Sequence, residues 1–202
     1  MIRKAALLLT LLAAAGCGST PPVAEVTSAG QREIVGTSGV PELTKISALT
    51  QGIIGLSPAI DPEEAARIAK IAVEYPLFTL APRYGAVDPP LVHNVKVNMG
   101  IKPRGLCKDW ADDLEARLRQ EGFQTVDFHR AIANADNIRI EHSTVIVSAK
   151  GAAWDQGIVL DPWREGQGVL YWARVLQDDH YTWIERSEVF RMKREWAASK
   201  PR

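Results

Sequence analysis

The sequence changes character at Gly122, and this change limits the folds that the chain can adopt. Before Gly122, apolar residues recur three and four positions apart, which is the spacing of amphipathic helices. After it, short runs rich in β-branched and aromatic residues alternate with turn residues, which predicts strands over 123–131, 138–149, 157–161, 169–175 and 181–185. A closing helix is expected over 187–198, capped by Ser187. Helices followed by an antiparallel sheet predict the α+β class, with the N-terminal helices packed on the sheet.

Two earlier helices are indicated by aspartate–proline signals. Asp61-Pro62-Glu63-Glu64 combines a capping aspartate, a proline at the first helical position and early acidic residues, and Tyr75-Pro76 should end this helix. Asp88-Pro89-Pro90 precedes a second helix over 91–99. A third helix should contain Cys107 and stop at Glu121-Gly122.

The N-terminus has the pattern of an export signal. Arg3-Lys4 precedes the apolar run 5–15, which is too short to span a bilayer, and Gly16-Cys17 follows. This end resembles a bacterial lipobox. The resemblance implies that the signal peptide 1–16 is removed and that Cys17 becomes a lipidated first residue, which would anchor the protein to a membrane. An ordinary cleaved signal with an incidental cysteine is the alternative. Gly18, where an aspartate often marks the inner membrane, favours the outer membrane, with the chain facing the periplasm.

The rest of the chain is expected to be a tether over 17–45 and one domain over 46–202. Lysine and arginine number 24, as do aspartate and glutamate, and loss of 1–16 leaves 22 basic against 24 acidic residues. This balance argues against nucleic acid as a partner. If Cys17 is lipidated, Cys107 has no disulfide partner. One remaining thiol and no histidine pair at ligand spacing also argue against a metal site, and no cofactor is expected.

Cys107 is therefore the residue that needs an explanation. It falls at the start of the third helix, on the apolar face that continues through Ala111 and Leu114. A helix N-terminus carries partial positive charge and unpaired N–H groups, which favour a thiolate and can hold an oxyanion. Three aspartates crowd the same helix start and oppose a thiolate: Asp109, Asp112 and Asp113. A catalytic thiol here would depend on an ion pair with a histidine.

His142 and Asp161 are the expected partners of that thiol. His142 begins an apolar strand, and Asp161 ends the next one. If Gly151-Ala152 forms a two-residue hairpin tip, paired positions sum to 303, and His142 stands directly opposite Asp161 on the same face. A longer loop over 154–157 would shift this register.

These residues resemble the transglutaminase-like cysteine hydrolases, a superfamily that shares papain's thiol chemistry. The resemblance rests on Gly105-x-Cys107-x-Asp109-Trp110-Ala111, the strand residue His142 and the strand end Asp161-Pro162-Trp163, and it covers about 60–185. It implies that Cys107 is the nucleophile, that His142 acts as general base and then acid, and that Asp161 orients the imidazole. It also implies a protease or amidase that acts on a peptide or protein of the cell envelope.

Further site residues are expected from their positions. The oxyanion would be held by the Cys107 N–H and one upstream donor, for which Asn94 and Asn98 are the candidates. Trp154 and Trp163 lie beside turns near the site and are candidates for a substrate groove. Two other interpretations stay open: a non-catalytic binding lipoprotein that retained the fold, and a structural lipoprotein in which Cys107 is a core residue.

Overall fold

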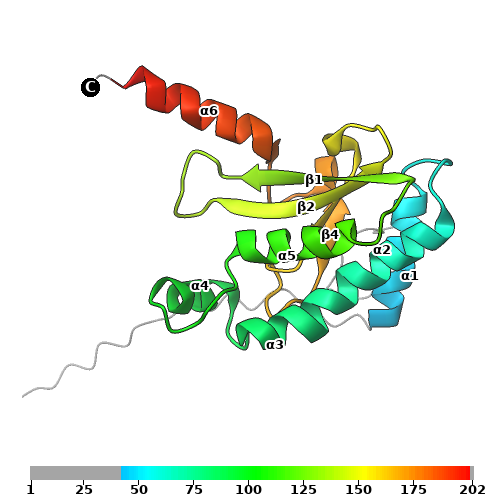
Figure 1. The fold of residues 1–202 in the computed structure, drawn as a ribbon, viewed down its shortest axis with the longest axis horizontal. Helices are drawn as coiled ribbons and strands as arrows, with labels where there is room; N and C mark the ends of the chain where they lie inside the picture. Colours follow the sequence, from blue (N-terminus) through cyan, green and yellow to red (C-terminus); the bar gives the residue numbers. More distant parts are fainter. Residues whose placement is uncertain (1–41, 201–202) are drawn as a thin grey trace, which may run out of the picture. The chain divides into compact units, whose positions relative to one another are not determined.

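A computed structural model describes residues 42–200 (Figure 1). The expected signal peptide, Cys17 and most of the expected tether lie outside these residues. The helices are α1 (Glu42–Ile54), α2 (Pro62–Tyr75), the π-helical segment Pro76–Leu80, α3 (Ala81–Tyr84), α4 (Pro90–Asn98), α5 (Cys107–Arg119) and α6 (Arg186–Ser199). The strands are β1 (Val126–Ala133), β2 (His142–Ala149), β3 (Ile158–Asp161), β4 (Tyr171–Arg174) and β5 (Trp183–Glu185). Within 42–200, no helix is both long enough and apolar enough to cross a membrane.

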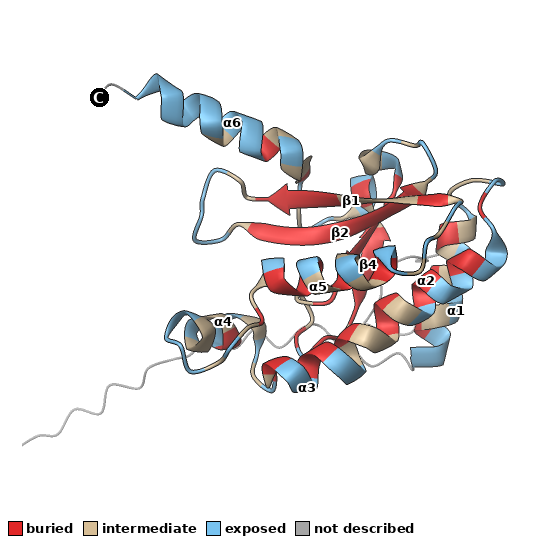
Figure 2. Ribbon diagram, viewed as in Figure 1, coloured by how far each residue is buried: buried red, intermediate tan, exposed pale blue. Residues whose placement is uncertain are grey.

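The strands form one antiparallel sheet in the order β4-β3-β2-β1-β5, which confirms the expected combination of N-terminal helices with an antiparallel sheet. Alternate side chains of β2 lie on opposite faces of this sheet. Val145 and Val147 pack with α1, α2 and α5 in the main core, whereas Ile146 packs with Trp183 on the other face. Figure 2 shows the strands buried and most of α6 exposed. The sheet is thus the buried centre of the fold, and the strand ends are where side chains from both faces can meet.

The start of the domain is earlier than predicted. The expected tether runs to residue 45, but α1 begins at Glu42, and Lys45, Leu49 and Ile53 are buried along one face of it. The helix carries none of the aspartate–proline signals that mark α2 and α4. Tertiary packing stabilises it instead, since Leu49 and Ile53 join the main core.

The chain also stays helical beyond Pro76, where the sequence predicts an end. Proline has no N–H to donate, so an ordinary α-helical ladder is interrupted there. The next turn widens, and the Ala81 N–H donates to the Pro76 carbonyl five residues back. The segment then continues as α3 and ends at Gly85, which has a left-handed φ of 61°. The predicted cap of α2 is confirmed, because Asp61 Oδ1 accepts the Glu63 and Glu64 N–H groups.

The register between β2 and β3 differs from the prediction by two residues. Val145 pairs with Leu160 and Val147 with Ile158, so paired positions sum to 305 and His142 is not directly opposite Asp161. The connection is longer than the predicted two-residue tip, because it includes a 3-10 turn over Trp154–Gln156. A shift of two keeps every side chain on its face. His142 therefore keeps the face of Ile146, and Asp161 shares that face as a diagonal neighbour.

Candidate active site

The turn before α5 places Cys107 at the first position of the helix. Asp109 Oδ2 accepts the N–H groups of Gly105 and Leu106, both at 3.0 Å, and the Trp110 indole N–H donates to the Gly105 carbonyl at 2.9 Å. Asp109 is thus a cap that fixes the turn, and the buried Trp110 ring packs beneath it. The Cys107 side chain is partly exposed, and its Sγ lies 3.6 Å from the Glu141 carbonyl oxygen, just before β2.

Gly105 is required by this turn. Its φ is +125°, and a Cβ added there would lie 2.3 Å from Nε2 of the buried His93. That nitrogen lies 2.9 Å from the Arg104 carbonyl oxygen, so His93 holds the same turn from below. His93 had no distinguishing context in the sequence, and its burial on the inner face of α4 was not predicted.

Gly105→Ala is expected to lower the free energy of unfolding by about 3 kcal/mol, because it combines a strained backbone with a steric clash. Gly122→Ala is the matched control: Gly122 also has a positive φ, +67°, but nothing lies within 4 Å of its added Cβ. In the control, the free energy of unfolding should fall only by the cost of the strained backbone, about 1 kcal/mol. Urea unfolding measures both, and equal losses would contradict the close packing of His93 on Gly105.

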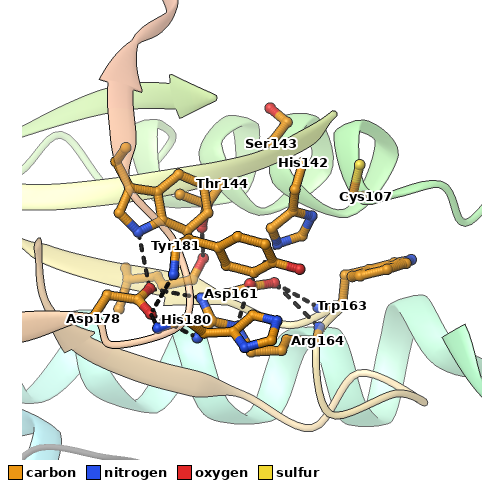
Figure 3. Close-up of polar contacts among 12 residues, drawn as sticks. Cys107, His142, Ser143, Thr144, Asp161, Trp163, Arg164, Asp178, His180 and Tyr181 are labelled. Carbon is orange, nitrogen blue, oxygen red and sulfur yellow. Dashed lines mark hydrogen bonds and ion pairs between the residues drawn. The ribbon is translucent and has the colours of Figure 1, made fainter. Parts of the chain in front are cut away.

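The structure brings Cys107, His142 and Asp161 together. His142 Nε2 lies 2.6 Å from Asp161 Oδ2, and the two side chains are 2% and 1% exposed. The other ring nitrogen, Nδ1, is buried and has no hydrogen-bond partner among residues 42–200. In Figure 3 the His142 ring lies between the Asp161 carboxylate and the Cys107 thiol. Cys107 comes from a helix on one face of the sheet and His142 from the other face, and they meet where β2 begins.

The charge state of His142 follows from its neighbours. Burial opposes the imidazolium, but the Asp161 carboxylate and the Cys107 sulfur outweigh it and raise the pKa of His142 to about 9. Burial likewise opposes the Asp161 carboxylate, yet His142, Arg164 and the Trp163 N–H together lower the pKa of Asp161. At neutral pH the two form an imidazolium–carboxylate pair.

This pair makes stability depend on pH. The pKa of His142 is raised from 6.5 to about 9 by folding, so the stabilisation is complete below about pH 6.5 and is lost as pH rises through about 9. The shift corresponds to at most about 3 kcal/mol. Urea unfolding of the wild type at about pH 6 and about pH 10 should show this loss. Because glutamine cannot be charged, His142→Gln should lose less of its free energy of unfolding between these two pH values. An equal loss in both proteins would contradict the raised pKa of His142.

The acidic residues around Cys107 are neutralised, contrary to the expectation of an uncompensated negative field. Asp112 pairs with Arg130, and Asp113 accepts from Arg104 Nη2 at 2.7 Å. Asp109 is occupied by backbone N–H groups. The expected opposition to a thiolate is therefore reduced by ion pairs that reach α5 from β1 and from the preceding turn.

The remaining predicted site residues divide into two groups. Trp163 lies against the His142 ring, with centroids 4.8 Å apart, and its indole N–H donates to Asn94 Oδ1 at 3.2 Å. Trp154 instead packs with the apolar cluster of the second sheet face, and Asn98 is exposed at the end of α4. Trp163 thus contacts His142 and holds Asn94, and Trp154 belongs to the cluster of Tyr181 and Trp183, whose rings also lie against His142, whereas Asn98 is exposed.

A second layer behind Asp161 was missed by sequence reasoning. Arg164 Nε lies 3.1 Å from Asp161 Oδ2, and its two terminal nitrogens bind Asp178 at 3.1 and 2.7 Å. The guanidinium stacks on Tyr171 and Tyr181, at 3.7 and 4.6 Å from the ring centroids. Asp178 also accepts three N–H groups from the segment that carries Tyr181 and Trp183 (Figure 3). Arg164 therefore connects the Asp161 carboxylate to the aromatic residues around His142.

The two remaining histidines are His129 and His180, and the His180 ring lies edge-on to Tyr181 with centroids 4.5 Å apart. His129 is half-buried on β1 and hydrogen-bonds Ser148 Oγ at 2.8 Å, and His180 is exposed. Within 42–200, no group of three or more His, Cys, Asp and Glu side chains could hold a metal ion. Comparisons with protein families, with curated proteins and with solved structures find no match to the chain.

Proposed function

We propose that this chain is a membrane-anchored thiol hydrolase, a protease or amidase of the transglutaminase-like superfamily with its α+β fold. The observation that carries the proposal is the buried His142 ring, which is ion-paired with Asp161 through Nε2 and has Nδ1 free beside Cys107. A nucleophilic thiol needs a histidine in contact with it and a third group that orients the histidine. The three residues fill these roles, and packing alone gives no reason to bury a charged pair next to a partly exposed thiol.

The reaction would begin from a thiolate–imidazolium pair of Cys107 and His142. The sulfur attacks the carbonyl carbon of an amide, a C–S bond forms, and the carbonyl electrons move to the oxygen. The tetrahedral intermediate then breaks its C–N bond, and His142 donates its proton to the leaving amine, which leaves a thioester. Water loses a proton to His142 and attacks the thioester, the C–S bond breaks, and the carboxylic acid product leaves. Asp161 keeps the ring oriented throughout.

The oxyanion would form at the N-terminus of α5. The first N–H groups of a helix have no intrahelical acceptor, so the Cys107 N–H is available. Asn94 is the better of the two side-chain candidates, because its carbonyl oxygen is held by the Trp163 indole and its amide N–H groups remain to donate. Trp163, beside His142, would line the substrate groove.

The cellular setting is part of the proposal. Lipidation at Cys17 would hold the domain at the outer membrane, facing the periplasm, where envelope proteins and peptidoglycan stem peptides are the substrate classes that contain amide bonds. Processing that is blocked by globomycin, and release from membranes in Cys17→Ser, are the expected results. A Cys17→Ser protein that stays on the membrane to the same extent as the wild type would contradict the lipid anchor.

Trapping of the thioester tests the chemistry. The chain is incubated separately with an unfolded protein and with peptidoglycan stem peptides, quenched in acid, and its mass is measured. A hydroxylamine-sensitive adduct on the peptide that contains Cys107, absent in Cys107→Ala, is expected with one substrate class. Neither an adduct nor amide cleavage with either class would favour the alternative, a binding lipoprotein in which the thiol remains against the Glu141 carbonyl.

A further inference from the structure

The outer face of α4 is an apolar surface beside the candidate active site. Large hydrophobic residues are exposed on α4 and its flanks: Val87, Leu91, Val92, Val95, Met99 and Ile101. Leu91, Val95 and Met99 are four residues apart, so they form one stripe along the helix. Exposed apolar side chains that occur singly need no explanation, but a continuous stripe indicates a contact surface.

Cations flank this stripe on both sides in the sequence. Segment 83–108 holds Arg83, Lys96, Lys102, Arg104 and Lys108 against the single acid Asp88, whereas the whole chain has a net charge of zero. Lys96 pairs with Asp88 and Arg104 with Asp113. The other three cations have no ion-pair partner among residues 42–200. Segment 83–108 therefore carries uncompensated positive charge before and after the apolar helix.

From this combination we propose that α4 and its flanks, 83–108, form a membrane-binding surface that lies on an anionic lipid bilayer. Helices with an apolar face and a Lys/Arg rim lie in the interface, with the apolar side chains among the acyl chains and the cations at the headgroups. Each cation near an anionic surface adds to the attraction. The proposed lipid anchor at Cys17 enters only as the reason why a bilayer is near.

The inner face of α4 connects this surface to the site. His93 contacts the Arg104 carbonyl in the turn before Cys107, and Asn94 contacts Trp163 beside His142. A bilayer that holds α4 would therefore lie next to the entrance of the site. Substrates at the membrane surface would be favoured over those free in solution.

Methionine oxidation tests this proposal with an internal control. Met99 lies on the stripe and is 68% exposed, whereas Met192 lies on α6 and is 45% exposed. The full chain is treated with dilute peroxide in the presence of vesicles of phosphatidylethanolamine and phosphatidylglycerol, or of phosphatidylcholine, and both sites are followed by peptide mass spectrometry. Oxidation of Met99 should slow severalfold with the anionic vesicles only, while oxidation of Met192 should be unchanged.

Two variants complete the test. Leu91→Ser/Val95→Ser should restore rapid oxidation of Met99 on anionic vesicles. The control Leu43→Ser/Leu176→Ser, at two positions on α1 and after β4 that are each 80% exposed, should not. Any vesicle binding by the expected signal peptide, 1–16, is the same in all these proteins. The proposal is overturned if Met99 is not protected, if Met192 is protected equally, or if Met99 is protected without vesicles at high protein concentration, which would indicate a second copy. None of these readouts depends on catalysis, so failure here is distinct from failure of the proposed hydrolase.

Discussion

Replacing His142 with alanine is expected to slow the alkylation of Cys107 by iodoacetamide at pH 7 about threefold. An unperturbed thiol is only a few per cent ionised at this pH, whereas an imidazolium beside the sulfur would keep it ionised. The gain from ionisation is at most about thirtyfold, but nucleophilicity falls by about half a log unit for each unit by which the thiol pKa is lowered, so the net gain is about threefold. In the proposed mechanism this imidazolium is His142, which contacts Asp161.

The control for this variant is His129→Ala. His129 is also a strand histidine, half-buried on β1, but its hydrogen bond is to Ser148 Oγ. Its replacement should leave the alkylation rate unchanged. The His142 variant should remain folded, because Arg164 still neutralises the buried Asp161 carboxylate. A folded His142→Ala protein that reacts at the wild-type rate would show that the histidine does not activate the thiol.

Arg164→Gln is expected to lower the free energy of unfolding by about 3–5 kcal/mol, which is the usual cost of removing one partner from a buried ion network. The side chains of Asp161 and Asp178 are 1% and 0% exposed, and both depend on the Arg164 guanidinium. Asp161 would keep His142 as a partner, but Asp178 would keep only N–H donors. Urea unfolding at neutral pH measures the loss.

A second substitution separates this effect from simple loss of packing. Asp178→Asn in the Arg164→Gln background removes the unpaired charge and should recover part of the stability. Arg191→Gln is the exposed control: Arg191 also bridges two carboxylates, Glu188 and Glu195, but its side chain is 53% exposed and the change should be within experimental error. If Arg164→Gln and Arg191→Gln lowered the free energy of unfolding by similar amounts, the buried ion network around Arg164 would be contradicted.

The local and periodic features of this chain could be predicted. The cap at Asp61, the strand positions and the first-turn position of Cys107 depend on short-range rules. His142 and Asp161 are in contact although the predicted β2–β3 register was wrong by two residues. A register shift of an even number of residues leaves each side chain on the same face of the sheet. The predicted contact was therefore correct, but the two residues are diagonal neighbours on one face of the sheet and not directly paired.

What was missed depends on contacts between distant segments. Arg164 and Asp178 are fourteen residues apart, joined by a loop and a strand, and only the folded chain brings them together. α1 lacks the aspartate–proline signal of α2 and α4 and is stabilised by the core, so residues 42–45 were assigned to the tether. A partial signal for Arg164 did exist: a buried aspartate next to a histidine would need a second cation, and Arg164 is the nearest one in sequence.

The rate of Cys107 alkylation as a function of pH tests the central claim most directly. If Cys107, His142 and Asp161 form a catalytic triad, the wild-type rate with iodoacetamide should already be on a plateau at pH 7, and this plateau should disappear in His142→Ala. A wild-type rate that rises only above about pH 8.5, as for a free thiol, would contradict the triad.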